Sequence, residues 1–136
     1  MQEPKTPAQQ PFSVFFVDGI IVGDWTGAPT LEAVRASFAE TLAQPEFKPG
    51  MPTLAQFRAE IEPPDADQLK LMAAEMAVHR GKLGPTALVV NSNQQLARAR
   101  DLTAFCSMSG VQVGVFTQVQ DAVRWLRREM EHKQAG

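Results

Sequence analysis

Short apolar runs alternate with longer amphipathic segments along most of this chain. The first two runs, SVFFV and IIVGDW, flank Asp18 and Gly19. Asp-Gly between two apolar runs is typical of a β-hairpin, because its two-residue turn needs positive φ angles that these residue types adopt most easily. The pattern therefore predicts that the domain opens with two antiparallel strands.

After this hairpin, helical and strand-like patterns alternate. Apolar residues recur at the spacing of one helix face in four segments, and three short apolar runs lie between them. The predicted helices run from Leu31 to Leu42, from Asp65 to about Arg80, from Asn93 to about Met108 and from Val119 to about Met130, and the predicted strands are TLAQFR, TALVVN and VQVGVF. Such alternation is typical of a largely parallel sheet with crossover helices. We therefore expect an α/β fold with a mixed sheet of about five strands, in which the hairpin forms an antiparallel edge.

Three of the predicted helices share one kind of beginning, in which an oxygen-bearing side chain precedes a glutamine by three residues. The pairs are Asp65 and Gln68, Ser92 and Gln95, and Thr117 and Gln120. In such a capping box the first side chain accepts a hydrogen bond from a free helix amide, and the glutamine reaches back toward the cap. Asp67 adds negative charge where the helix dipole favours it. The acidic stretch AEIEPPDADQLKL is thus interpreted mainly as a helix start.

The composition indicates one soluble domain. The chain has 136 residues, and its 13 Lys and Arg residues against 15 Asp and Glu residues give a net charge of -2. No strong field therefore attracts the whole chain to nucleic acid or to an anionic membrane, and no apolar run reaches the roughly 18 residues of a membrane span. We expect a cytoplasmic domain over residues 12–131, with a flexible Pro-rich tail over residues 1–11 and a C-terminal tail over residues 132–136.

The sequence signatures of the common α/β enzymes are absent. The chain contains no GxGxxG, no GxxxxGK[ST] and no GxSxG motif. His79 and His132 have no partner at the spacing of metal ligands. Cys106 lies among apolar residues on one helix face, which favours a small buried hydrophobe over a nucleophile. We therefore predict a protein that is not an enzyme and has no catalytic residue, metal or cofactor.

The helix predicted from Asp65 carries two apolar faces. One face suits the core, and the roughly opposite face carries Leu71, Ala74 and Val78. These residues are either scattered surface hydrophobes or an interface with a partner, most simply a second copy of the chain.

The order and spacing of these segments resemble a known family. The segment Phe47-Lys48-Pro49-Gly50, the run ALVVNSNQQLARARDLTAF and the ending VQVGVFTQVQDAVRWL are similar to the bacterial SpoIIAA-like proteins, which are related to STAS domains. The most specific part is the ending, where Val115-Phe116 closes a strand and Ala-x-x-Trp-Leu follows in a helix. The resemblance covers about residues 13–128. It implies a βα superhelix with helices mainly on one face of the sheet.

The resemblance also implies a function in binding rather than catalysis. STAS-type anti-sigma-factor antagonists bind partner proteins, and a partner kinase phosphorylates a Ser or Thr at the start of their second helix. Residues 63–68 of this chain read PPDADQ, so the start of the regulatory helix offers Asp65 and Asp67 but no Ser or Thr. The first interpretation is therefore a protein-interaction module that lacks the switch residue.

The SpoIIAA-like proteins are also distantly similar to CRAL-TRIO lipid-transfer domains, which implies an alternative function. The chain would then carry or sense an apolar small molecule or lipid in a pocket between sheet and helices. The side chains expected to line this pocket are Phe15, Trp25, Phe38, Phe57 and Met72. The two interpretations differ in whether the chain binds a protein surface or an apolar ligand.

Overall fold

The computed structural model of this chain describes residues 10–135, with side chains up to His132. Strands β1 (Phe12–Val17) and β2 (Ile20–Trp25) form an antiparallel pair. Asp18 and Gly19 join them with φ angles of 51° and 80°, which confirms the hairpin predicted from Asp-Gly.

Three crossover helices connect the remaining strands. In chain order the elements after the hairpin are α1 (Leu31–Leu42), β3 (Thr53–Phe57), α2 (Ala66–Val78), β4 (Thr86–Val89), α3 (Asn93–Met108), β5 (Val113–Phe116) and α4 (Val119–Ala135). The five strands lie in the order β1-β2-β3-β4-β5, and β2 to β5 are parallel. This arrangement confirms the mixed five-stranded sheet.

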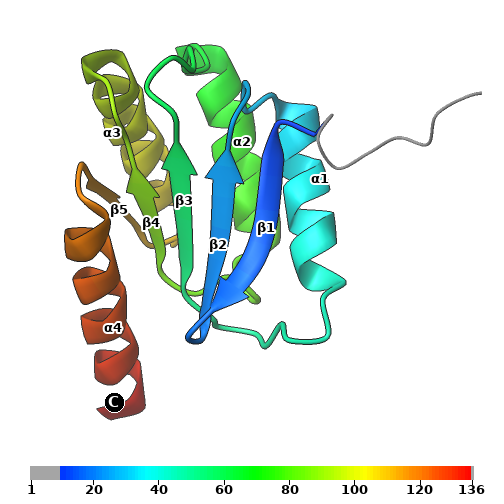
Figure 1. Cartoon of the computed structure of the whole chain (residues 1–136), viewed down its shortest axis with the longest axis vertical. Helices are drawn as coiled ribbons and strands as arrows, with labels where there is room; N and C mark the ends of the chain where they lie inside the picture. Colours follow the sequence, from blue (N-terminus) through cyan, green and yellow to red (C-terminus); the bar gives the residue numbers. More distant parts are fainter. Residues whose placement is uncertain (1–9, 136) are drawn as a thin grey trace, which may run out of the picture.

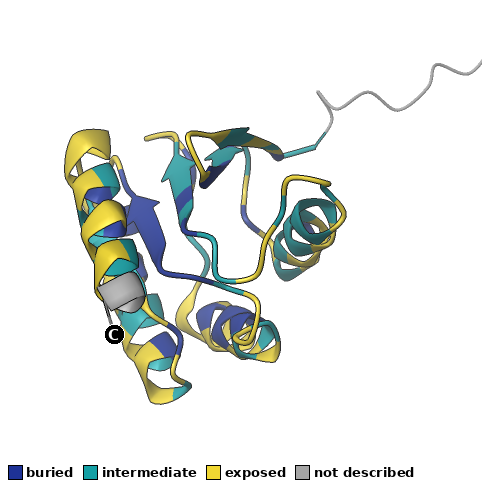
Figure 2. Ribbon diagram, turned by 90° about the horizontal axis from the view of Figure 1, so that it is seen from below, coloured by how far each residue is buried: buried dark blue, intermediate teal, exposed yellow. Residues whose placement is uncertain are grey.

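The position of the helices follows from the handedness of the crossovers. Each parallel connection adds the next strand on the same side of the last one, and right-handed crossovers that advance in one direction place their helices on one face of the sheet. Helices α1, α2 and α3 accordingly share one face, as the views along and across the sheet show (Figure 1, Figure 2). We call this the three-helix face.

Helix α4 covers the opposite face of the sheet. It packs on β3, β4 and β5, where Ala122 and Leu126 have no exposed surface. Within the described residues, α4 leaves part of β1 uncovered on this face, because Phe15 and Val17 remain 45% and 46% exposed. The predicted layout, with helices mainly on one face, is confirmed.

The end of the chain differs from the prediction. Helix α4 continues beyond Met130 to Ala135, so residues 132–135, expected as part of a C-terminal tail, are helical. Residues 131–135 read EHKQA and contain neither Gly nor Pro, so nothing in their propensity ends the helix. Residues 1–9 of the predicted N-terminal tail lie outside the described residues.

The helix starts confirm two of the three predicted caps. Asp65 Oδ1 accepts a hydrogen bond from the Gln68 amide at 2.9 Å, and Ser92 Oγ accepts one from the Gln95 amide at 3.1 Å. The third cap is wrong, because α4 begins at Val119 and Thr117 therefore lies two residues before the helix. The segment around Asp65 is a helix start, as expected.

Within residues 10–135, none of the helices combines the length and the apolar character that crossing a membrane requires.

Candidate functional site

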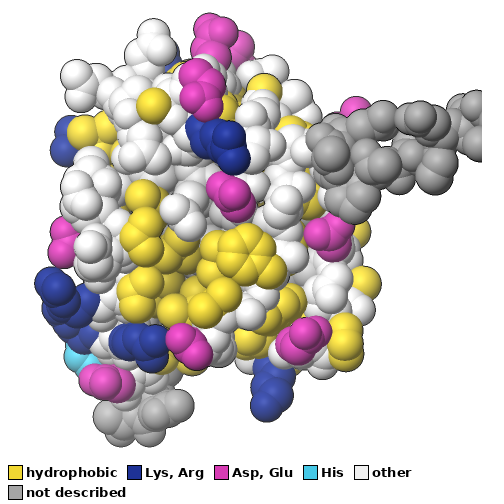
Figure 3. Space-filling view, in the orientation of Figure 1, with side chains coloured by type: hydrophobic (Ala, Val, Ile, Leu, Met, Phe, Trp, Pro, Cys, Tyr) yellow, Lys and Arg dark blue, Asp and Glu magenta, His cyan; other side chains and the backbone are white. Residues whose placement is uncertain are grey.

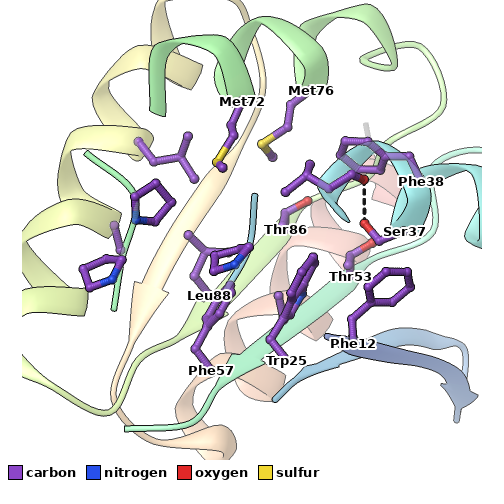
Figure 4. Close-up of a pocket in the computed structure, with 18 of the residues that line it drawn as sticks. Phe12, Trp25, Ser37, Phe38, Thr53, Phe57, Met72, Met76, Thr86 and Leu88 are labelled. Atoms are coloured by element: carbon purple, nitrogen blue, oxygen red, sulfur yellow. Dashed lines mark hydrogen bonds between the residues drawn. The ribbon is translucent and has the colours of Figure 1, made fainter. Parts of the chain in front are cut away.

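An apolar cavity of about 160 Å³ lies between the sheet and helices α1, α2 and α3. Its floor is the three-helix face of the sheet, and its roof is the inner side of the helices (Figure 4). The aromatic and methionine side chains that line it are Phe12, Trp25 and Phe57 from the strands and Phe38, Met72 and Met76 from the helices.

The aromatic floor follows from strand register. In the hairpin Phe12 lies opposite Trp25, and in the parallel pair Trp25 lies beside Phe57, so all three side chains point to one face. The ring centroids of Phe12 and Trp25 are 5.1 Å apart, and those of Trp25 and Phe57 are 6.0 Å apart with an interplanar angle of 20°. Three strands thus present a continuous apolar surface to the cavity.

The roof is more adaptable than the floor. Met72 and Met76 lie one turn apart on α2 and are 4% and 6% exposed. Their unbranched thioether side chains have several rotatable bonds and adjust readily to the shape of a neighbour. Phe38 of α1 closes one side of the cavity, and its ring centroid lies 4.9 Å from that of His79.

Two hydroxyl groups beside the cavity are already engaged. Ser37 Oγ donates to the carbonyl oxygen of Val34 at 2.7 Å (Figure 4), and Thr86 Oγ1 donates to that of Gly84 at 3.3 Å. Across the described part of the chain, no buried side-chain nitrogen or oxygen lacks a hydrogen-bond partner. An apolar molecule in the cavity would therefore leave these two hydroxyl groups paired.

Four of the five side chains expected around a pocket meet in this cavity. They are Trp25, Phe38, Phe57 and Met72. The expectation for Phe15 is wrong, because Phe15 lies opposite Val22 in the hairpin and points to the face that α4 partly covers. Sequence reasoning also missed Phe12. The Asp18-Gly19 turn contained the signal, since a two-residue turn at this position pairs Phe12 with Trp25 and places them on one face.

Phe15 instead belongs to an exposed apolar area. Figure 3 shows hydrophobic side chains gathered on the face of the molecule where β1 and β2 lie beside α4. Two large hydrophobic residues of β1, Phe15 and Val17, stay substantially exposed there. They lie opposite the buried Val22 and Ile20 of β2. We call Phe15 and Val17 the β1 surface pair.

The outer side of α2 is also apolar. Leu71 and Val78 are 55% and 74% exposed, and Ala74 lies exposed between them. These three residues, which we call the α2 stripe, lie on the side of the helix opposite Met72 and Met76. Asp65 and Asp67 at the start of α2 are exposed as well.

An ion pair joins α1 and α2, the helices that carry Phe38 and Met76. Arg35 Nε of α1 donates to Glu75 Oε1 of α2 at 3.0 Å, and His79 Nε2 lies 3.3 Å from Glu75 Oε2. The hydrogen bond from Arg35 lowers the pKa of Glu75 below its ordinary value of 4.5, burial opposes this change, and the contact with His79 adds to the lowering.

Cys106 is a core residue, as predicted. It has no exposed surface, and its Sγ lies 3.7 Å from Met76 Sδ. Burial raises the pKa of the Cys106 thiol from 9.0 to about 11. A thiol that remains protonated and inaccessible does not act as a nucleophile.

Comparison with known proteins identifies the fold. No protein-family model matches the chain, and no curated protein matches it. A solved structure from Shewanella loihica PV-4, described as an uncharacterized protein of the DUF3478 family with a SpoIIAA-like fold, superimposes with a TM-score of 0.55. The match is 14% identical and covers 85% of this chain and 91% of that one. The chain therefore has a SpoIIAA-like fold.

Proposed function

We propose that this protein binds a small apolar molecule, or the apolar part of a larger one, in the cavity between the sheet and helices α1, α2 and α3. The observation that carries the proposal is the cavity itself, with its floor of three aromatic side chains. The proposed role is that of a cytoplasmic carrier or sensor without enzymatic activity.

The volume of the cavity defines the size of the apolar group. Protein interiors are close-packed, and voids larger than a water molecule are few. A dry apolar cavity of roughly 150 Å³ binds benzene, whereas pockets for drug-sized ligands begin at roughly 300 Å³. The cavity of about 160 Å³ therefore fits one aromatic ring or a short aliphatic chain.

The energetic cost of an empty cavity also favours a ligand. Apolar side chains around a cavity lack part of the van der Waals contacts of a packed core. An apolar ligand that fills it restores the missing van der Waals contacts, so binding stabilises the fold.

Toluene is a suitable first probe, because it is apolar and close to the size of the cavity. NMR of the methionine methyl groups should show shifts at Met72 and Met76 on titration, because an aromatic ring would lie against both. Met108 is 86% exposed on α3 and serves as the internal control, with no shift expected. The proposal is wrong if Met72 and Met76 behave as Met108 does at toluene saturation.

A cavity-filling variant provides a second test. Ala99 of α3 lines the cavity and is 7% exposed, so Ala99→Leu should fill part of the volume and weaken toluene binding. Ala74→Leu makes the same change at an exposed position of α2 and should bind as the wild type does. Native mass spectrometry of freshly purified protein would then reveal an apolar molecule retained from the cell.

A second candidate function, a protein-interaction module, is supported by the exposed apolar surfaces outside the cavity. These are the α2 stripe and the β1 surface pair. Apolar residues gathered on a surface favour contact with another protein. The start of α2 offers no hydroxyl side chain for a kinase, because its cap is Asp65, so this candidate would act without the phosphorylation switch of the anti-sigma-factor antagonists.

A further inference from the structure

A second hollow adjoins the apolar cavity. It is more open, has a volume of about 630 Å³, and shares Pro29, Pro63, Pro64 and Arg98 with the cavity as lining residues. It lies where the chain leaves the carboxyl ends of β2 and β3 and enters α1 and α2. This end of the strands is where open α/β sheets commonly bind ligands. A molecule in the cavity therefore lies next to this outer hollow, with the three prolines and Arg98 at the boundary.

The outer hollow is more polar than the cavity. Its polar lining residues are Thr30, Glu62, Asp65, Gln68, Gln94 and Arg98. The two hollows together provide an apolar space and a more polar space beside it. This arrangement suits an amphipathic molecule.

The formal charges of the outer hollow are predominantly negative. Glu62 and Asp65 contribute two carboxylates, and Arg98 contributes one guanidinium. Arg98 Nη1 already donates to Asp101 Oδ2 at 3.2 Å, so its charge is partly compensated from outside the hollow. A negatively charged ligand group would meet two carboxylates and a cation that already has a partner.

At the two helix starts beside the hollow, the cap already engages one free amide of each helix. The amide nitrogens of a helix start attract anions when they lack partners. Here Thr30 Oγ1 accepts from the Ala33 amide at 3.1 Å, and Asp65 Oδ1 accepts from the Gln68 amide at 2.9 Å. The cap of α2 is itself an anion, so it opposes a second negative charge at the same place.

We infer that the ligand is amphipathic, with its apolar group in the cavity and a polar end in the outer hollow that is uncharged or cationic, such as an alcohol or an amine. A carboxylate or phosphate end is disfavoured. This inference rests on the proposed function and adds the chemical class of the polar end.

Three probes that share a phenylpropyl group separate the polar end from the apolar part. They are phenylpropanol, phenylpropylamine and phenylbutyrate, which end in a hydroxyl, an ammonium and a carboxylate. Calorimetric titration at neutral pH should show that the alcohol and the amine bind more tightly than the carboxylate. One unit charge at about 4 Å in water changes an affinity by about fivefold, which is the expected difference between the alcohol and the carboxylate, and the amine and the carboxylate differ by two charges and should differ by about thirtyfold.

Charge-removing variants identify the residues responsible. The double variant Glu62→Gln with Asp65→Asn should weaken amine binding and strengthen carboxylate binding. Asn is as good a helix cap as Asp, so the start of α2 is kept. The matched control is Glu32→Gln with Asp67→Asn, which removes one acid from the first turn of α1 and one from the first turn of α2. Neither position lines the hollow, so the control should leave the order of the probes unchanged.

The outcomes distinguish this inference from the proposed function. If toluene binds but phenylbutyrate is the tightest of the three probes, or all three bind equally, the inference about the polar end is overturned and the cavity proposal stands. The same holds if the double variant and its control behave alike. If neither toluene nor any phenylpropyl probe binds, the proposed function fails and this inference fails with it.

Discussion

The side-chain nitrogen of Gln95 in α3 lies 3.0 Å from the carbonyl oxygen of Ile61 in the loop that follows β3. The same nitrogen donates to the carbonyl oxygen of Arg58 at 2.6 Å, and Gln95 Oε1 accepts from the backbone amide of Asn91 at 2.8 Å. Gln95 is 4% exposed and lines the cavity. One buried amide thus fixes the loop between β3 and α2 against α3.

Replacing this amide should destabilise the fold. Gln95→Leu leaves the Ile61 carbonyl and its neighbours without their partner, and a buried polar group left unpaired costs about 1–3 kcal/mol. Urea denaturation should show a loss in this range. Gln94→Leu, at the exposed neighbouring position, is the control and should change the free energy of unfolding little. Equal losses for the two variants would contradict a specific role for Gln95.

The core under α4 should depend on Leu126. This side chain has no exposed surface and packs against strand residues such as Leu54 and Ala87. Leu126→Ala should cost about 2–5 kcal/mol, because the neighbours cannot fully close the space that the side chain leaves. Met108→Ala removes a large side chain that is 86% exposed and should cost less than about 0.5 kcal/mol. Urea denaturation of both variants tests the difference.

The ion pair between Arg35 and Glu75 should make a small, pH-dependent contribution to stability. Arg35 is 61% exposed in its side chain, so Arg35→Gln should lower the free energy of unfolding at pH 7 by no more than about 1 kcal/mol. The pKa of Glu75 lies below 4.5 in the folded state. The contribution is therefore present above pH 4.5 and is lost as the pH falls through the lower, folded-state pKa.

Chemical denaturation between pH 7 and about pH 3 measures this effect. The difference between the wild type and Arg35→Gln should shrink on acidification. Arg124→Gln removes the exposed partner of Asp121 within α4 and is the control, with no comparable trend. If the difference in the free energy of unfolding between the wild type and Arg35→Gln grew toward low pH, the expected direction of the pH dependence would be wrong.

Cys106 should not react with thiol reagents in the folded protein. Burial raises its pKa to about 11 and leaves no exposed surface, so both the thiolate and the access that the reaction needs are missing. At pH about 8 a disulfide reagent should modify no thiol in native buffer and one thiol per chain in denaturant. Met108→Cys adds an exposed thiol and should give one rapid reaction in native buffer. Rapid modification of the native wild type would contradict the buried position.

The α2 stripe should determine self-association if the chain forms a dimer through this helix. Leu71→Glu with Val78→Glu places two charges in such an interface, and light scattering should then show a lower mass than for the wild type. Met108→Glu changes an exposed apolar residue on α3 and is the control. A mass unaffected by the α2 changes but lowered by Phe15→Glu would assign the interface to the β1 surface pair instead.

The sequence predicted the local structure well where a local interaction decides it. Asp18-Gly19 defines the hairpin, and Asp65 and Ser92 cap their helices through hydrogen bonds to residues three positions later. The sequence predicted only part of the role of Gln95. The spacing from Ser92 places it in a capping box. In the structure its side chain instead accepts from the backbone amide of Asn91, one residue before the cap, and donates to two carbonyl oxygens of the loop after β3.

The sequence by itself determined the order of strands and helices and the largely parallel sheet, because periodicity and turn residues are local signals. The helices on one face were implied by the resemblance to the SpoIIAA-like proteins. The sequence also contained the register that sends Phe12 and Phe15 to opposite faces. Only the tertiary structure decided that Trp25, Phe38, Phe57 and Met72 surround a cavity, and that a more polar hollow adjoins it at Pro63 and Pro64. The physical reason is that a cavity depends on the distance between packed layers, which is set by many side chains at once and is not encoded by any one segment.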